Sequence, residues 1–337
     1  MKTFVTGASG HVGANLIREL LARGVAVKAL FRMRSNNRAL EGLDLERVEG
    51  DLRDLSSLER AMRGCDRVYH LAAFVSLRAG DRNALFEANV VGTKNLLDAA
   101  ERAGVERVVH CSSLGAIGPN PSCGLSDETH TVNPYKVHLD YELSKAVSEL
   151  EVHRAVARGM DVVIVNPSGV VGPHDYLPSS VGRSILDFAA GRMHAYLAGG
   201  VEFVAVRDVV AGHLLAMERG KRGERYILSG GHHRLEAILE HLQALTGAPV
   251  PRLRLPLSLM LPVAHVSSLI MDRIFPSVPP RFTPGTIRLL STPKQVSTQK
   301  SQRDLGFRPT SVLEAFREQV DWFEAQGLLA RRRGRSR

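Results

Sequence analysis

A tyrosine and a lysine stand four residues apart in the stretch YELSK, which runs from Tyr141 to Lys145. Residues at positions i and i+4 lie on one face of an α-helix, so the Lys145 ammonium can sit beside the Tyr141 hydroxyl. A free tyrosine has a pKa of about 10, and a nearby ammonium is expected to lower that pKa. The pair could therefore exchange a proton with a carbonyl or an alcohol, although one turn of an ordinary surface helix has the same pattern.

A glycine-rich loop, TGASGHVG at residues 6–13, separates the expected first strand, Lys2–Thr6, from a helical segment, Asn15–Arg23. Glycines let the backbone turn sharply and approach phosphates, and the N-terminus of a helix stabilises their negative charge. The spacing is G-x-x-G-x-x-G, and a purely structural turn is the alternative. We expect this loop to bind a dinucleotide pyrophosphate through Gly7, Ser9, Gly10, His11, Val12 and Gly13.

The end of the second expected strand, Val25–Phe31, indicates which dinucleotide is bound. An acidic residue there usually accepts a hydrogen bond from the ribose 2′-hydroxyl of NAD. Phe31 takes that place and Arg32 follows it, and an arginine can pair with a 2′-phosphate. This favours NADP(H), with NAD(H) as the alternative if Arg32 is only a solvated loop residue. Arg34 and Arg38 could share the role of Arg32.

Two further segments are expected along the cofactor edge of the sheet. Asp51 in the stretch GDL could accept a hydrogen bond from the adenine amino group, with Leu52 beside it, whereas Asp54 fits a helix cap. The fourth strand ends in HLAA, whose small residues would let a cofactor lie across the sheet edge. The contacts predicted in that stretch are Leu71, Ala72 and Ala73.

The composition is that of a globular protein, because 44% of the 337 residues are hydrophobic and 23% are charged. The net charge of +9 depends partly on five arginines within residues 331–337, which lack interleaved aromatics, so we expect no nucleic-acid binding. Three cysteines without metal-site spacing indicate reduced thiols in a cytoplasmic protein, and the early first strand leaves no room for a signal peptide. We expect no metal site, and we expect His70, His138 and His174 to be structural or solvated.

Strands and helices alternate in the first half of the chain, which predicts a Rossmann-type doubly wound parallel sheet with helices on both faces. Short apolar runs occur at 68–72, 108–112 and 162–166, and long helices are expected at 85–103 and 141–158. After Pro167 the alternation breaks. We therefore assign residues 1–166 to a dinucleotide-binding domain and 331–337 to a basic tail. Residues 167–330 form mainly an interleaved, smaller substrate domain, with some segments returning to the main sheet.

The segment Leu255–Met271 has no formally charged side chain and is long enough to raise the question of a membrane span. Pro256, Pro262 and His265 argue against a spanning helix, so we expect none. A helix packed in the C-terminal domain is the favoured interpretation. A greasy lid or a peripheral membrane contact is the alternative.

Seven motifs occur in one order along the chain: TGASGHVG, GDL, HLAA, NVVGTKNLL, CSS, YELSK and NPSGVVGP. Together they resemble the extended branch of the short-chain dehydrogenase/reductase superfamily, the NAD-dependent epimerase/dehydratase family. The resemblance covers nearly the whole chain. It is strongest to dihydroflavonol-reductase-like proteins, 3β-hydroxysteroid-dehydrogenase-like proteins and hopanoid-associated sugar epimerases. It implies an NAD(P)-dependent enzyme and a homodimer formed through the two long helices.

YELSK is similar to the Y-x-x-x-K motif of that family. The resemblance implies that Tyr141 exchanges a proton with the substrate, while Lys145 also holds the ribose of the nicotinamide half. Ser113, five residues before Gly118, matches the third catalytic residue, with backbone capping as the alternative. Asp208 is expected to cap a helix. The remaining implied cofactor contacts are Asn89, Ser112, Pro167 and Ser168.

Three functions compete on this basis. The first is the NADP(H)-dependent reduction of a ketone or aldehyde on a fairly hydrophobic small molecule, which Arg32 and the apolar segment support. The second is a nucleotide-sugar epimerase or dehydratase with bound NAD. Its diphosphate would need basic groups, for which Arg183, Arg192, Arg252 and Arg254 are available. The third is a non-catalytic cofactor-binding regulator, and such proteins tend to lose the tyrosine or lysine that this chain retains.

Overall fold

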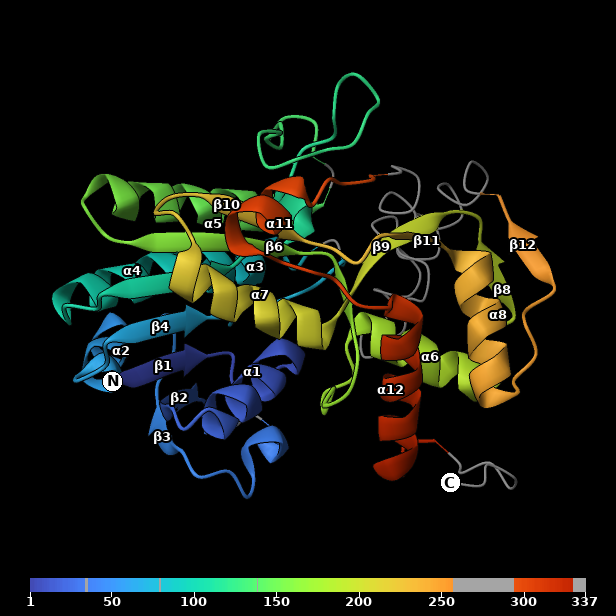
Figure 1. Cartoon of the computed structure of the whole chain (residues 1–337), viewed down its shortest axis with the longest axis horizontal. Coiled ribbons are helices and arrows are strands. Elements are labelled where there is room, and N and C mark those ends of the chain that lie inside the picture. The colour runs from blue at the N-terminus through green and yellow to red at the C-terminus, as the bar shows by residue number, and fades with distance from the viewer. Residues whose placement is uncertain (34–35, 79, 138, 257–293, 330–337) are drawn as a thin grey trace.

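Seven parallel strands form the main sheet, in the order β10-β6-β5-β4-β1-β2-β3 (Figure 1). The computed structural model describes residues 1–33, 36–78, 80–137, 139–256 and 294–329. The strands are β1 Lys2–Thr6, β2 Ala26–Phe31, β3 Glu46–Glu49, β4 Arg67–His70, β5 Arg107–Cys111, β6 Val162–Pro167 and β10 Arg225–Leu228. The predicted Rossmann-type sheet is confirmed. Its strand order reverses between β1 and β4, and ligands of open α/β sheets bind beside such a reversal, at the carboxyl ends of the strands.

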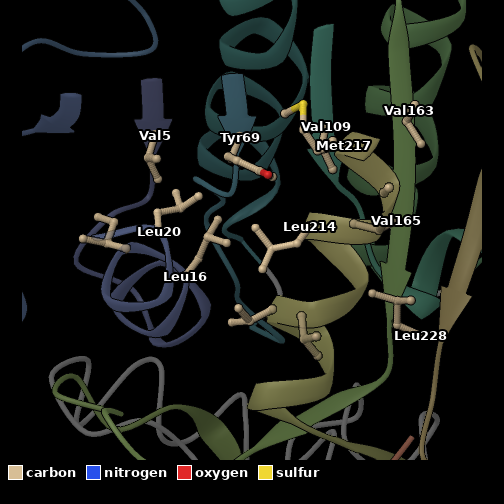
Figure 2. Packing of buried hydrophobic residues seen from close by; sticks show 14 of the residues in the cluster. Val5, Leu16, Leu20, Tyr69, Val109, Val163, Val165, Leu214, Met217 and Leu228 are labelled. Carbon is tan, nitrogen blue, oxygen red and sulfur yellow. The ribbon is translucent and has the colours of Figure 1, made fainter. Parts of the chain in front are cut away.

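Helices cover both faces of the sheet because its central strands are apolar on both sides. β6, for example, reads VVIVNP, and every one of its residues is buried. One face packs against α1, His11–Ala22, and α7, Val206–Arg219. Figure 2 shows Leu16 of α1 and Leu214 of α7 pointing toward each other beneath the strands. The opposite face is covered by α2, α4 and α5, which span Leu55–Met62, Gly92–Arg102 and Asp140–Ala157.

The first of the two expected long helices begins earlier than predicted and is not uniform. It consists of α3, Arg82–Phe86, a π-helical stretch η2, Glu87–Val91, and α4. A π-helical turn holds one more residue than an α-helical turn and is frequent at functional sites. Here it turns Asn89 inward, where the residue is only 1% exposed.

The C-terminal part builds a three-stranded sheet, β11-β9-β7, and a two-stranded sheet, β12-β8. Its strands are β7 Gly169–Val171, β8 Ala195–Leu197, β9 Gly200–Ala205, β11 His232–Arg234 and β12 Leu253–Leu255. Its helices are α6 Ser180–Ala189, α8 Leu235–Thr246, α11 Gln299–Leu305 and α12 Val312–Ala325, and short turns occur at η1 Arg38–Leu40 and η3 Leu114–Ala116. The chain passes from β6 into β7 and from β10 into β11. Both crossings lie at the carboxyl edge of the main sheet, so that edge is the junction between the two parts (Figure 1).

Most of the apolar segment 255–271 and the whole basic tail 331–337 lie outside the described residues. Among the helices that the structure describes, none combines the length and apolar character needed to cross a bilayer. The same part of the chain holds no group of three or more side chains that could ligate a metal ion. The three cysteines are free thiols.

Candidate active site

The glycine-rich loop lies tightly against the segment that follows β4. Gly7 has a φ of +69°, in the left-handed region, and a Cβ there would lie 2.5 Å from the backbone nitrogen of Ala72. A Cβ on Gly13 would lie 2.1 Å from the Gly7 carbonyl oxygen. Gly10 is the N-cap of α1 and brings no side chain to the first amides of the helix. The loop is therefore a backbone cradle at a helix N-terminus, which is where a pyrophosphate fits.

Two residues of α1 attach this cradle to the C-terminal part. His11 Nε2 lies 3.1 Å from the Pro173 carbonyl oxygen, and Asn15 Nδ2 donates to the same oxygen at 2.9 Å. Burial lowers the pKa of His11, so the ring is neutral and Nε2 carries the donated proton. His11 therefore links the cradle to the segment after β7. Ser9 in the loop and Val12 in the first turn of α1 are both partly exposed.

At the end of β2, Phe31 is partly buried and Arg32 is exposed. Nearby, both carboxylate oxygens of Asp51 accept hydrogen bonds from Arg53, at 3.0 and 2.7 Å. These hydrogen bonds, with a smaller contribution from Arg32, hold the pKa of Asp51 at about 2. The carboxylate that was expected to bind adenine is thus ionised and paired with Arg53, a residue that the sequence analysis missed. Leu52 packs against the start of α4.

The other residues predicted around this corner are placed differently. Arg38 donates to Gln326 Oε1 at 3.2 Å, and Arg34 lies outside the described residues. Asp54 accepts from the backbone nitrogen of Ser57 at 3.2 Å, which confirms it as the N-cap of α2.

The backbone after β4 is pinned to β1, which leaves its small residues at the sheet edge. Leu71 N donates to the Thr6 carbonyl at 3.3 Å, and Ala72 N donates to Thr6 Oγ1 at 3.3 Å. Ala73 is exposed. Leu71 and Ala72 therefore lie against the glycine cradle, and Ala73 faces solvent beside it.

Asn89 of the π-helical stretch holds the loop after β4 against α5. Its Oδ1 accepts from Phe74 N at 2.8 Å, and its Nδ2 donates to the Phe74 carbonyl and to Ser144 Oγ, both at 2.9 Å. Ser144 Oγ in turn donates to the Tyr141 carbonyl at 2.8 Å. Because protein groups engage both ends of its amide, Asn89 orients the surrounding segments and is not free to reach outward.

Ser113, Tyr141 and Lys145 meet at the carboxyl edge of β5. Ser113 lies just after that strand and close enough to Tyr141 to lower the pKa of its hydroxyl, and Ser113 Oγ accepts a hydrogen bond from Gly115 N at 3.1 Å, as the capping alternative predicted. Lys145 is 1% exposed and donates from Nζ to the Cys111 carbonyl at 2.8 Å. The structure thus brings together the three residues predicted as catalytic.

The protonation of Tyr141 differs from the expectation. Burial raises the pKa of Tyr141 to about 12, and the nearby Ser113 hydroxyl offsets this effect only in part. The predicted lowering by Lys145 is wrong for this structure, because the ammonium is directed at the Cys111 carbonyl and burial disfavours the phenolate. Tyr141 is therefore protonated at neutral pH, which suits a proton donor.

Two buried hydroxyls on the same sheet edge have no hydrogen-bond partner in the part of the chain that the structure describes. They belong to Ser112, after β5, and Ser168, after Pro167 at the end of β6. The two residues are 4% and 8% exposed. Buried polar groups are rarely left without a partner. With the glycine cradle, these two hydroxyls make the edge fit a dinucleotide that would supply the missing hydrogen bonds.

Several other residues singled out from the sequence have structural contacts. Asp208 is not a helix cap as expected, because it lies within the first turn of α7 and accepts from Thr310 N at 2.7 Å. His70 is buried between Thr6 and Thr93, whose hydroxyls lie 2.8 and 3.0 Å from its ring nitrogens. The His174 ring contacts aromatic neighbours, and His138 lies outside the described residues.

Residues 3–229 match the NAD dependent epimerase/dehydratase family. The chain belongs to this family. It is 52% identical over 329 residues to sterol demethylase protein B of Methylococcus capsulatus, covering 98% of this chain and 100% of that protein. It is 40% identical over 330 residues to a putative dihydroflavonol 4-reductase of Synechocystis, covering 96% and 95%. Among solved structures, the dTDP-glucose 4,6-dehydratase DesIV of Streptomyces venezuelae, crystallised with NAD, superposes with a TM-score of 0.80 at 25% identity, covering 98% and 99%.

These comparisons confirm the resemblance seen in the seven motifs. The protein is an NAD(P)-dependent enzyme of the extended short-chain dehydrogenase/reductase type. The relatives include both reductases and dehydratases, so family membership supports oxidoreductase chemistry without naming the substrate.

Three polar residues beside the site were not predicted, of which Glu149 and Asn166 are buried and Lys294 is partly buried. Glu149 and Asn166 lie behind Ser113, joined by a 2.7 Å hydrogen bond. Lys294 donates to the Leu114 carbonyl at 2.8 Å, and burial lowers its pKa to about 8. The sequence did contain a signal for Glu149, because a residue four positions after Lys145 lies on the same face of the helix. The position of Lys294 depends on long-range folding.

Proposed function

We propose that this enzyme is an NADP(H)-dependent oxidoreductase that reduces a ketone or aldehyde group of a fairly hydrophobic small molecule. The observation that carries the proposal is the meeting of Ser113, a protonated Tyr141 and the buried Lys145 at the carboxyl edge of β5. These groups share the carboxyl edge of the sheet with the cradle between Gly7 and Gly13. A proton donor and a dinucleotide cradle at one edge are the two elements that carbonyl reduction requires.

In this proposal, Tyr141 donates its proton to the substrate oxygen, and Ser113 donates a hydrogen bond that holds this oxygen. Bound NADPH would supply the hydride. Lys145 would hold the ribose hydroxyls of the nicotinamide half. The unpartnered hydroxyls of Ser112 and Ser168, together with Pro167 at the end of β6, are the proposed contacts of the nicotinamide half.

The choice of NADP(H) rests on the corner at the end of β2. Phe31 stands where a carboxylate would be needed for the NAD ribose, and the exposed Arg32 follows it. The Asp51 carboxylate would repel a 2′-phosphate, but Arg53 neutralises it with two hydrogen bonds. The corner is therefore suited to an additional phosphate, with NAD(H) as the alternative cofactor.

The hydrophobic character of the substrate is supported by two observations. The relatives named above include a sterol demethylase protein and a dihydroflavonol reductase, whose names denote apolar ring systems. The loop after β4 exposes Phe74 and Val75, which are 38% and 58% exposed, close to Asn89 and the site. Residues after Pro167 would supply the remainder of the substrate pocket.

A nucleotide-sugar epimerase or dehydratase with bound NAD is the alternative, because DesIV shares the fold and holds NAD. The arginines available for a diphosphate already have partners in several cases. Arg183 donates to the Pro178 carbonyl at 2.6 Å, Arg192 pairs with Asp187, and Arg254 pairs with Glu236 at 3.1 Å. The reductase is therefore the better-supported function.

A homodimer through α4 and α5 is part of the proposal by likeness to the superfamily. Leu150 on α5 is 55% exposed and Val91, just before α4, is 45% exposed. Exposed apolar side chains on neighbouring helices are suited to packing against a second copy.

Titration with NADPH and NADH, followed by protein fluorescence, tests the cofactor assignment. We expect tighter binding of NADPH and, in Arg32→Ala, loss of most of this preference, because a charged hydrogen bond contributes about 1.5–3 kcal/mol, or roughly 10–150-fold in affinity. Arg38→Ala is the matched control, since Arg38 contacts Gln326, and it should keep the preference.

A screen of apolar ketones for NADPH oxidation then tests the reaction. Equal or tighter binding of NADH, or NAD that copurifies with the protein, would contradict the assignment. The epimerase function would then become the leading one, because an epimerase shows no net consumption of cofactor.

A further inference from the structure

Glu149 lies on the same face of α5 as Tyr141 and Lys145, one further helical turn along. It is 4% exposed, although it carries a carboxylate. Its Oε1 accepts from Asn166 Nδ2 at 2.7 Å, and its Oε2 lies 3.1 Å from Arg225 Nη1. A buried carboxylate is costly unless it is paired and hydrogen-bonded, so the position of Glu149 is well defined.

Asn166 connects this carboxylate to the reacting groups. It is fully buried on β6, and its Nδ2 donates not only to Glu149 but also to the Ser113 carbonyl, at 3.0 Å. Both amide hydrogens are thus committed. The backbone of Ser113, which positions its hydroxyl near Tyr141, is anchored through Asn166 to α5.

Glu149 also acts on the charge of Lys145. Burial lowers the pKa of Lys145, while the Cys111 thiol and the Glu149 carboxylate oppose this effect. The other titratable groups that face Lys145 are Tyr141, one turn earlier on α5, His70 of β4 and His110 of β5. Burial raises the pKa of Tyr141 and lowers the pKa of both histidines, so all three are neutral at pH 7. Burial also raises the pKa of Cys111 to about 11, which keeps its thiol neutral. Glu149 therefore supplies the negative charge that favours the Lys145 ammonium.

Arg225 of β10 closes the network on its far side. It pairs with Glu149 and donates to the Glu128 carbonyl, and Glu128 Oε1 accepts from Ile227 N at 2.9 Å. Glu149 is held from α5, β6 and β10 at once. A rotation of its side chain would break its contacts with both β6 and β10.

We propose that Glu149 is a positioning residue for this active site, which orients Ser113 through Asn166 and keeps Lys145 protonated. The inference rests on the proposed roles of Ser113 and Lys145, and it adds a residue that touches neither substrate nor cofactor. We therefore expect removal of the Glu149 charge to slow turnover and to shift the pH dependence of both dinucleotide binding and kcat.

The test compares Glu149→Gln with the native enzyme in two measurements. The amide keeps an oxygen for Asn166 but removes the charge. The first measurement is the affinity for whichever dinucleotide binds more tightly, taken from pH 6 to pH 10. Without Glu149 the pKa of Lys145 falls, so we expect the alkaline loss of binding to move to lower pH by about half a unit or more.

The second measurement is the pH dependence of kcat and KM for carbonyl reduction. We expect kcat to fall by about 10–100-fold with KM nearly unchanged, because orientation of the reacting groups is lost rather than uniform binding. The alkaline limb of kcat should move in the same direction as the binding curve.

Glu149→Gln leaves Arg225 without its carboxylate, so a fold defect must be separated from a positioning defect. The double variant Glu149→Gln/Arg225→Met removes both charges, and we expect it to regain thermal stability while keeping the displaced pH curves. Asp161→Asn is the matched control. Its ion pair with Arg107, at 2.7 Å, joins β5 to the start of β6 at the opposite end of the sheet, and its loss should lower stability without moving either curve.

Native pH curves in a folded Glu149→Gln or double variant would overturn the proposal. Native dinucleotide binding without carbonyl reduction by the unmodified enzyme would instead count against the proposed function. The binding curves would still decide the role of Glu149 in that case.

Discussion

The protonation state of Tyr141 decides whether this residue acts first as a proton donor or as a proton acceptor. Burial raises its pKa to about 12, so the residue is a phenol at neutral pH and is ready to donate. A motif shows that a tyrosine and a lysine are adjacent, but the sign of a pKa shift depends on whether burial or the ammonium has the larger effect. Here burial has the larger effect, because Lys145 Nζ is directed at the Cys111 carbonyl.

Tyr141→Phe removes this proton without changing the shape of the ring. We expect kcat for carbonyl reduction to fall by about 10²–10⁴-fold, the usual contribution of a positioned acid. Steady-state kinetics at pH 7 measures this loss. Dinucleotide affinity, measured by fluorescence, should change by less than about threefold, since the cradle between Gly7 and Gly13 is untouched. A parallel collapse of affinity would instead make Tyr141 a binding residue.

The cradle shows how an element depends on the absence of side chains. A Cβ at position 13 would lie 2.1 Å from the Gly7 carbonyl oxygen, whereas one at position 10 would lie 3.2 Å from the same oxygen. Gly10 also has a φ of −77°, which any residue adopts. The two glycines thus differ in the steric cost of a methyl group within one loop.

Gly13→Ala should therefore destabilise the protein by about 1–3 kcal/mol through overpacking and should abolish dinucleotide binding. Gly10→Ala is the matched control, with a cost below about 1 kcal/mol and weakened binding. Urea denaturation with and without dinucleotide measures both effects. Equal losses in the two variants would mean that the close contact at position 13 relaxes freely.

At the same scale, the sequence located most strands and helices but not their irregularities. Apolar runs marked β4, β5 and β6 to within two residues, because buried parallel strands are continuously apolar. The apolar pattern of residues 85–103 did not reveal the π-helical stretch Glu87–Val91, since one additional residue barely disturbs a pattern with period 3.6. The pairing of Asp51 with Arg53 depends on the loop conformation, and the pairing of Glu149 with Arg225 depends on the assembled sheet.

For the site, the sequence predicted the types of group better than their partners. Ser113, Tyr141 and Lys145 followed from the motif and its helical spacing. The full engagement of Asn89 by Phe74 and Ser144 could not, because those contacts join three separate segments. Long-range hydrogen bonds are a property of the folded chain and leave no periodic signal.

Three buried histidines make the stability of the whole molecule depend on pH. His70, His110 and His213 are at most 1% exposed. Burial lowers their pKa, to about 3 for His70 and about 4 for His213, against about 6.5 in the unfolded chain. Between these folded pKa values and pH 6.5, the histidines therefore bind protons in the unfolded state but not in the folded state. Stability is fully present above pH 6.5 and is lost progressively as the pH falls toward these folded values.

We expect the free energy of unfolding, measured by urea denaturation, to fall from pH 7 to pH 4. Each such histidine contributes a slope of up to about 1.4 kcal/mol per pH unit. His213→Leu should reduce this slope, whereas His153→Leu, at an exposed position of α5, should leave it unchanged. A slope that is identical in the native protein and in His213→Leu would contradict the assignment.

The last strand of the main sheet to be synthesised is β10, and it brings Arg225 to Glu149. Ser113, Tyr141 and Lys145 have already been synthesised when this strand is still to be made. Until β10 pairs with β6, the nascent chain exposes the unpaired edge of β6, and the Glu149 carboxylate lacks its ion pair with Arg225. The reacting groups are therefore synthesised before Arg225, which holds Glu149 in place. Catalysis should begin only once β10 has paired with β6.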